Sequence, residues 1–167
     1  MMKNRYTYSL AFLFTFFLIA GVQSSQAQLV TQEGDITAGA GLSYGTDIEE
    51  IGLTVQAYYA FTNEIRGGGS FTYYFTGDNW NANEFNVDVH YLFRNEDGLI
   101  LYGLGGLNFS TVSVSFMGQS NSETDTGLNI GGGVEYDLGS VYLFGEPKFT
   151  IGGFEQLQLT AGVRLRF

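Results

Sequence analysis

The side chains of this chain that could do chemistry are a few charged residues and one histidine. The set comprises Arg66, Asp88, His90, Glu135, Lys148 and Arg164, and the same pattern includes Asp137, Glu146 and Arg166. Each stands in a segment where polar and apolar residues alternate, so each belongs to the polar row of a strand. If that row is enclosed, its charges must pair, because the desolvation of an unpaired charge is costly. The pattern predicts an internal salt-bridge network, and a narrow path for ions or solutes is the functional alternative.

His90 is the only histidine, so an imidazole acid or base could act at this position alone. A histidine on an enclosed polar row is more simply a hydrogen-bonded structural residue. We therefore predict no catalytic residue, and we do not expect the chain to be an enzyme.

Two other patterns could suggest a ligand site. Glycine runs at 67–69, 103–106 and 131–133 lie within strands and are not followed by Lys-Ser or Lys-Thr, so we interpret them as places of strand curvature rather than phosphate loops. Acidic residues of the connecting segments, which could bind divalent cations, are Asp47, Glu49, Glu50, Glu123 and Asp125. Their spacing matches no calcium loop, which favours a solvated surface. No metal or cofactor is expected.

Eight alternating segments must position the charged side chains. They span residues 35–45, 51–61, 65–75, 84–93, 98–115, 127–138, 141–151 and 156–167. Each is long enough for a tilted strand to cross a bilayer. The fifth segment is apolar on both rows and places Ile100 and Leu104 on the inner one. Pro147 cannot donate to a strand ladder, so it predicts a bulge in the seventh segment.

The final segment alternates most regularly. Its apolar row consists of Leu157, Leu159, Ala161, Val163, Leu165 and Phe167. With its terminal aromatic residue, this strand resembles the closing strand of bacterial outer-membrane β-barrels. The resemblance implies that Val163, Leu165 and Phe167 form the signal read by the barrel assembly machinery. It also implies that the apolar row faces lipid and the polar row faces the barrel interior.

The N-terminus has the pattern of a cleaved signal peptide. Lys3 and Arg5 give a positive start, residues 10–20 are apolar, and Ser25-Gln26-Ala27 supplies the small residues of a cleavage site. The apolar run is shorter than the roughly 20 residues that span a bilayer. We predict that residues 1–27 are removed. The sequence has no cysteine, which excludes disulfides and a lipoprotein anchor.

Aromatic residues cluster at both ends of the predicted strands, as expected where amphipathic rings meet lipid headgroups. One belt comprises Tyr59, Phe61, Tyr91, Phe93, Tyr136 and Phe167, and the other comprises Tyr44, Tyr73, Phe75, Phe85, Phe109 and Phe149. An even strand count lets both termini lie on one side, expected to be the periplasm. Turns at 62–64, 94–97 and 139–140 would then be periplasmic. Loops at 46–50, 76–83, 117–126 and 152–155 would be external, and the polar loop at 117–126 is not expected to pack.

The predicted mature domain, residues 28–167, resembles the small eight-stranded outer-membrane β-barrel family that includes OmpA- and OmpX-type proteins. The resemblance implies an all-β fold, an eight-stranded antiparallel up-and-down transmembrane β-barrel in the bacterial outer membrane. The interior of such a barrel is only wide enough for side chains to fill. No segment is expected after the barrel, so the peptidoglycan-binding role of some relatives is not predicted.

These features predict a non-enzymatic integral outer-membrane protein with a structural or surface-interaction role and a lumen plugged by polar side chains. Expected partners are outer-membrane lipid and lipopolysaccharide, the barrel assembly machinery, and extracellular proteins that contact the loops. The net charge of −10 argues against nucleic acid.

Three alternatives remain open. The first is a narrow channel for small or apolar solutes, as in OmpW-type relatives, which Ile100 and Leu104 favour. The second is a lipid-modifying outer-membrane enzyme, although His90 lies on an inner row away from the outer leaflet. The third is a secreted soluble barrel, which would place apolar residues inside and polar residues outside.

Overall fold

The computed structural model describes residues 29–77, 80–116, 119–139 and 141–167. The predicted signal peptide at residues 1–27 lies outside these ranges. Within them, no helix is long and apolar enough to span a membrane.

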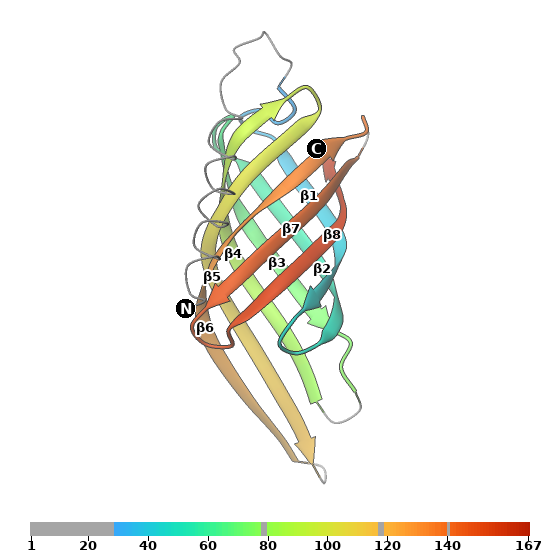
Figure 1. Ribbon diagram of the computed structural model, residues 1–167, viewed down its shortest axis with the longest axis vertical. Helices are drawn as coiled ribbons and strands as arrows, with labels where there is room; N and C mark the ends of the chain where they lie inside the picture. Colours follow the sequence, from blue (N-terminus) through green and yellow to red (C-terminus); the bar gives the residue numbers. More distant parts are fainter. Residues whose placement is uncertain (1–28, 78–79, 117–118, 140) are drawn as a thin grey trace, which may run out of the picture.

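Eight antiparallel strands follow one another around a closed barrel (Figure 1). They are β1 (Ile36–Gly45), β2 (Glu50–Ala60), β3 (Ile65–Tyr74), β4 (Trp80–Glu96), β5 (Leu99–Phe116), β6 (Gln119–Asp137), β7 (Tyr142–Ile151) and β8 (Gln156–Arg166). Each strand pairs with the next along the chain, and β8 pairs with β1 to close the ring. The predicted eight-stranded up-and-down barrel is confirmed.

The barrel has two distinct ends. The end that we call the turn end carries the β2–β3, β4–β5 and β6–β7 connections, the start of β1 and the end of β8. The opposite end, which we call the loop end, carries the other four connections. There the β5–β6 hairpin projects well beyond the rest of the barrel, at the bottom of Figure 1.

Strand alternation places apolar side chains outside and polar side chains inside. Val55 on β2 is exposed, whereas its neighbours Thr54 and Gln56 are buried. The largest fully buried side chains include Arg66, Arg164 and Lys148. This is the reverse of a soluble protein, whose charged residues are almost never fully buried. It is also the reverse of the soluble ligand-binding barrel that the sequence left open.

The β5–β6 hairpin is longer than predicted. We expected an unpacked loop over 117–126, but β5 and β6 remain paired from Asn108↔Gly127 to Phe116↔Gln119. Side-chain hydroxyls also pair across the hairpin, with 2.8 Å between Ser113 Oγ and Ser122 Oγ. The β6 half of this ribbon, residues 119–126, contains no apolar residue and therefore gave no strand signal in the sequence. Its β-prone residues and backbone ladder suffice to form it. β4 likewise begins at Trp80, four residues earlier than predicted.

The predicted bulge at Pro147 is wrong. The β6–β7 ladder is interrupted near Pro147 but resumes in the same register, from Gly131↔Lys148 to Val134↔Gly145. Proline removes one N–H donor there without inserting an extra residue. The register shift occurs instead in β4, between Leu92 and Arg94.

This bulge changes which residues of β4 point inward. His90 and Leu92 precede it and are buried at even positions, whereas Asn95 follows it and is buried at an odd position. One extra residue in one strand of an antiparallel pair has this effect, because side chains alternate with a period of two. The bulge therefore aims the Asn95 side chain into the turn end of the barrel.

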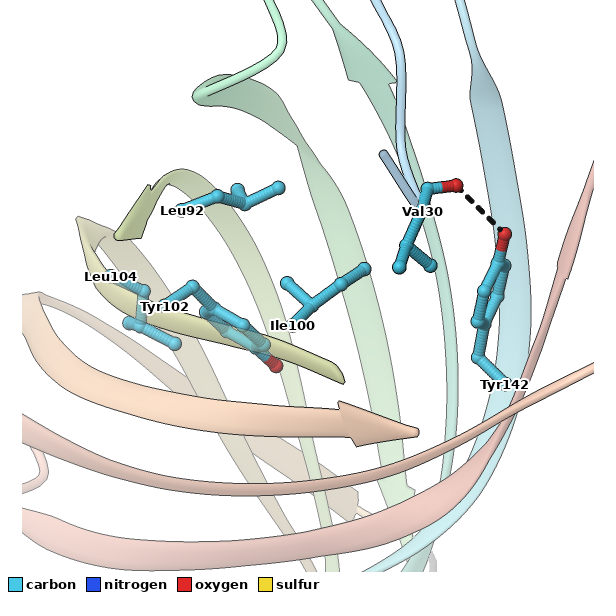
Figure 2. Close-up of a cluster of buried hydrophobic side chains, with 6 residues drawn as sticks. All are labelled: Val30, Leu92, Ile100, Tyr102, Leu104 and Tyr142. Atoms are coloured by element: carbon cyan, nitrogen blue, oxygen red, sulfur yellow. Dashed lines mark hydrogen bonds between the residues drawn. The ribbon is translucent and has the colours of Figure 1, made fainter. Parts of the chain in front are cut away.

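An apolar cluster fills the turn end (Figure 2). It consists of Val30, Leu92, Ile100, Tyr102, Leu104 and Tyr142. Val30 belongs to residues 29–33, which precede β1 and which we call the strap. The inward positions that the sequence predicted for Ile100 and Leu104 are confirmed, since both side chains are buried.

The seam between β1 and β8 is closed by two facing glycines, Gly41 and Gly162. A Cβ atom at Gly41 would lie 2.5 Å from the backbone oxygen of Ala161. The strands can therefore approach this closely only without a side chain at this position. At Gly145, by contrast, the nearest atom to a Cβ would be Val134 Cγ1 at 3.9 Å.

We expect Gly41→Ala to destabilise the barrel by about 1–3 kcal/mol, because the added methyl group has no room at the seam. Gly145→Ala is the matched control and should change the free energy of unfolding by less than about 0.5 kcal/mol. Urea unfolding in phospholipid vesicles, followed by the fluorescence of the single tryptophan, measures both variants. Equal stabilities of the two variants would contradict the close approach at the seam.

Candidate functional site

The candidate site is a network of ionic side chains in the middle of the barrel. Its members come from inward positions of five strands, so no two neighbours in sequence supply it. They are Arg66 on β3, Asp88 and His90 on β4, Glu135 on β6, Glu146 and Lys148 on β7, and Arg164 on β8. All seven are buried, with exposed fractions of 5% or less.

Glu135 lies at the centre of the network. Its carboxylate accepts hydrogen bonds from the guanidinium groups of both Arg66 and Arg164. Arg66 uses both terminal nitrogens, and its Nη1 lies 3.2 Å from Glu135 Oε2. Bidentate pairs of this kind are among the stronger charge-assisted hydrogen bonds. One carboxylate therefore holds two cations that come from two different strands, β3 and β8.

Arg164 also contacts a second carboxylate. Its Nη2 donates to Glu146 Oε2 and to Gln56 Oε1, both at 3.0 Å. The Tyr102 hydroxyl donates to the same Glu146 oxygen at 2.5 Å. Two carboxylates thus face two guanidinium groups, which balances the charge of this layer.

His90 is held within the network. Its Nδ1 accepts a hydrogen bond of 3.1 Å from Arg66 Nε, so this nitrogen carries no proton. Its ring stacks on Tyr102, with 4.5 Å between ring centroids and 7° between planes, and also contacts Tyr58. No serine or carboxylate hydrogen-bonds to this imidazole among the described residues. The geometry is that of a packed structural histidine.

Aromatic rings enclose the two guanidinium groups. Arg66 lies over the Tyr102 ring at 4.8 Å, and Arg164 lies over the Phe144 ring at 4.1 Å. Tyr58 contacts both cations. Such cation–π contacts are strongest in desolvated surroundings, where they help to offset the cost of burying the charges.

A second ion pair lies beside the first group. Lys148 Nζ is 3.5 Å from Asp88 Oδ2, and Asn129 Nδ2 donates to Asp88 Oδ1 at 2.8 Å. Asn129 also donates to Asn86 and accepts a hydrogen bond from Thr150. The polar residues continue the ionic network without a break toward the loop end.

Neutral polar groups fill the lumen near the loop end. Ser43, Thr54, Thr72 and Thr160 form a chain of hydroxyl hydrogen bonds. Beyond them, the amides of Gln156 and Gln158 donate to the Glu84 carboxylate. Glu84 has no ion-pair partner in the described part of the chain, so neutral donors alone satisfy it.

The structure brings the six sequence-predicted residues together in two groups. Arg66, His90, Glu135 and Arg164 form one, and Asp88 with Lys148 forms the other. Two further charged residues that share the alternation, Asp137 and Arg166, lie at the turn end rather than in the lumen. Arg166 is half-exposed and lies 3.8 Å from Asp35.

Sequence reasoning missed several members of the site. Tyr58, Tyr102 and Gln56 point inward by the same alternation. The predicted network did not include them, because it was built from charged residues and His90 alone. Glu84 was placed at the first position of its segment, and its distance from the other charges gave no sign of its amide partners. Because Phe85 faces outward, alternation predicts that its neighbour Glu84 faces inward, and this pattern would have identified Glu84.

The residues predicted as an assembly signal lie on the outer face of β8. Val163, Leu165 and Phe167 are all exposed. The Phe167 backbone N–H donates to the Ile36 carbonyl at 2.8 Å, which extends the β1–β8 seam to the last residue.

Solved structures share this fold. The N-terminal β-barrel domain of OprF from Pseudomonas aeruginosa matches with a TM-score of 0.71 and 18% identity, covering 82% of this chain and all of that one. Neisserial surface protein A matches with a TM-score of 0.63 and 21% identity, over 80% of this chain and 96% of its own.

Ail, the attachment invasion locus protein of Yersinia pestis, matches with a TM-score of 0.61 and 22% identity, over 81% of this chain and 100% of its own. Ail has also been solved in complex with the heparin analogue sucrose octasulfate. At these identities the likeness shows the fold alone.

No curated relative matches the sequence. The family model described as the outer membrane protein beta-barrel domain matches residues 12–167, which is nearly the whole chain. The chain therefore belongs to this family of bacterial outer-membrane β-barrels.

Proposed function

We propose that this protein is a non-enzymatic outer-membrane barrel whose lumen is plugged by its own side chains and whose loop end acts at the cell surface. The observation that carries the proposal is the pairing of Glu135 with both Arg66 and Arg164 across the lumen. A water-filled channel needs free space at this level, and these three side chains occupy it.

The filling of the lumen extends over its whole length. From the turn end to the loop end it consists of the apolar cluster, the ionic network, the hydroxyl chain and the Glu84 amide group. Eight-stranded barrels have interiors that side chains can fill, which agrees with this arrangement. A continuous column of water would have to break the ion pairs between Glu135 and the two arginines.

We expect the refolded protein to be electrically silent in planar lipid bilayers, because each level of the lumen is occupied. The measurement is single-channel recording on protein whose folding is first checked by heat-dependent gel mobility. Discrete conductance steps that change with Arg164→Gln would overturn the plugged lumen and support the narrow channel.

We expect Glu135→Gln to destabilise the barrel by about 3–5 kcal/mol, since it leaves Arg66 and Arg164 without their shared carboxylate. The control is Glu64→Gln in an exposed turn, which should change stability by less than about 0.5 kcal/mol. Urea titration in vesicles measures both. A small effect of Glu135→Gln would mean that water reaches the network and solvates the two cations.

The narrow channel for apolar solutes is the second candidate function. One observation favours it: Leu92, Ile100 and Leu104 form an apolar region inside the turn end. The ionic network stands between this region and the loop end, so a solute path along the axis would have to break Arg–Glu pairs. The third candidate, a lipid-modifying enzyme, is less favoured, because His90 is packed between two tyrosines.

The surface role rests on the loop end. Of the seven Lys and Arg residues, Lys3 and Arg5 lie in the predicted signal peptide and five lie in the described chain. Those five are in the lumen or at the turn end, so the described loop end carries acidic side chains without cations. A polyanion such as the sucrose octasulfate that binds Ail would be repelled there. We therefore propose that the surface partners of this chain are neutral or cationic.

We also propose that the outward row of Val163, Leu165 and Phe167 on β8 is the signal read by the barrel assembly machinery.

We propose that the turn end, with both termini, faces the periplasm and that the β5–β6 hairpin faces outward. The absence of cysteine makes this directly testable. Ser122→Cys, in the hairpin, should react with a membrane-impermeant maleimide on intact cells. Glu64→Cys, in the β2–β3 turn, should react only after the outer membrane is permeabilised. The opposite pattern would reverse the proposed orientation.

A further inference from the structure

The strap, residues 29–33, packs against the turn end of the barrel, where Val30 and Thr31 are buried. The chain reverses direction at Gly34, which has a φ of 91°, in the left-handed region that favours glycine. A small turn fixes this reversal, because Gln32 N–H donates to Asp35 Oδ2 and Asp35 N–H donates to Gln32 O. Gly34 and Asp35 bond to Ala60 of β2, so the hinge belongs to the barrel wall and the strap extends from it.

Asn95 holds the strap through its side-chain amide. Its Oδ1 accepts the backbone N–H groups of Val30 and Thr31 at 3.2 and 2.8 Å. Its Nδ2 donates to Thr31 O at 2.6 Å and to Asn63 O at 2.8 Å. One side-chain amide thus binds both the N–H and the carbonyl of Thr31, as the backbone of a neighbouring strand would. The β4 bulge is what points Asn95 inward to do so.

Other contacts complete the closure. The Val30 carbonyl accepts hydrogen bonds from Tyr142 Oη and from Arg166. Glu33 N–H donates to Asn63 Oδ1 at 2.9 Å. Below these contacts the Val30 side chain packs into the apolar cluster, with Ile100 between it and the deeper residues of that cluster (Figure 2).

We propose that the strap is a releasable stopper of the lumen, hinged at Gly34 and latched by Asn95. Its release exposes an apolar pocket lined by Leu92, Ile100 and Leu104 while the barrel stays folded. The strap is separable from the wall because only Val30 and Thr31 are buried, whereas its other three residues are exposed. Segments with few buried contacts open locally at a much lower free energy than the whole domain.

The test uses a cysteine reporter below the strap. Ile100→Cys replaces a fully buried side chain that pairs directly with Asn95 in the β4–β5 ladder. Its reaction with a water-soluble maleimide is followed in the full chain folded in detergent micelles. We expect slow labelling, far slower than that of Glu64→Cys in an exposed turn.

Two changes should release the strap. Thr31→Pro removes the N–H that donates to Asn95, and Asn95→Ala removes the latch itself. Thr31→Pro should accelerate labelling of Ile100→Cys by about fivefold, because it removes one hydrogen bond to Asn95. Asn95→Ala should accelerate it by more than about tenfold, because it removes all three hydrogen bonds between this side chain and the strap. Thr31→Ala retains the N–H, and Asn108→Ala removes a buried amide nearer the loop end. Both controls should leave the labelling rate unchanged.

The controls distinguish release of the strap from unfolding of the whole barrel. Heat-dependent gel mobility must persist in every variant, and Leu104→Cys serves as the reporter if Ile100→Cys does not fold. Labelling of the parent reporter as fast as that of Glu64→Cys would mean that the strap does not close the lumen. Unchanged labelling in both Thr31→Pro and Asn95→Ala would mean that another element forms the barrier. Either result overturns the proposal.

Discussion

The structure depends on one constraint: the wall of the barrel faces lipid, so the polar side chains must lie inside and satisfy one another there. Desolvated charges are tolerated only when paired and hydrogen-bonded. Glu135 meets this requirement for Arg66 and Arg164 together, and the surrounding tyrosines cover the guanidinium faces. Because these partners come from β3, β6 and β8, the network forms only when the ring is complete. The charge pairs therefore depend on barrel closure, and they stabilise the closed barrel in turn.

Closure in turn requires a close approach of β1 and β8. The facing glycines of β1 and β8 permit this at the seam, and the seam extends to the backbone of Phe167. The β4 bulge has a different effect. By moving the inward face from even to odd positions, it turns Asn95 inward, where its amide binds the N-terminal strap. One extra residue in β4 thus places the side chain that binds the strap at the turn end.

The functional proposals follow from this filling. We propose that the apolar cluster, the ionic network and the hydroxyl chain fill the lumen, which leaves the outer wall and the two ends for interactions. The wall presents apolar rows to lipid, as expected for this family. The β5–β6 hairpin extends the barrel with a polar ribbon of exposed hydroxyl and acidic side chains. An anionic ribbon of this kind repels polyanions and attracts cations.

The sequence alone determined the number of strands, their order and the face on which most residues lie, because a period of two is a local property that each segment carries by itself. It therefore placed Ile100, Leu104 and Glu135 on inner rows. Only the tertiary structure decided which inner residues meet, since Glu135 finds Arg66 across the ring, 69 positions away in the chain. It also placed the bulge near Leu92 rather than at Pro147, and it extended the hairpin through residues whose alternation carries no apolar signal. Register, bulges and partner choice depend on how all eight strands close together, and no single segment contains that information.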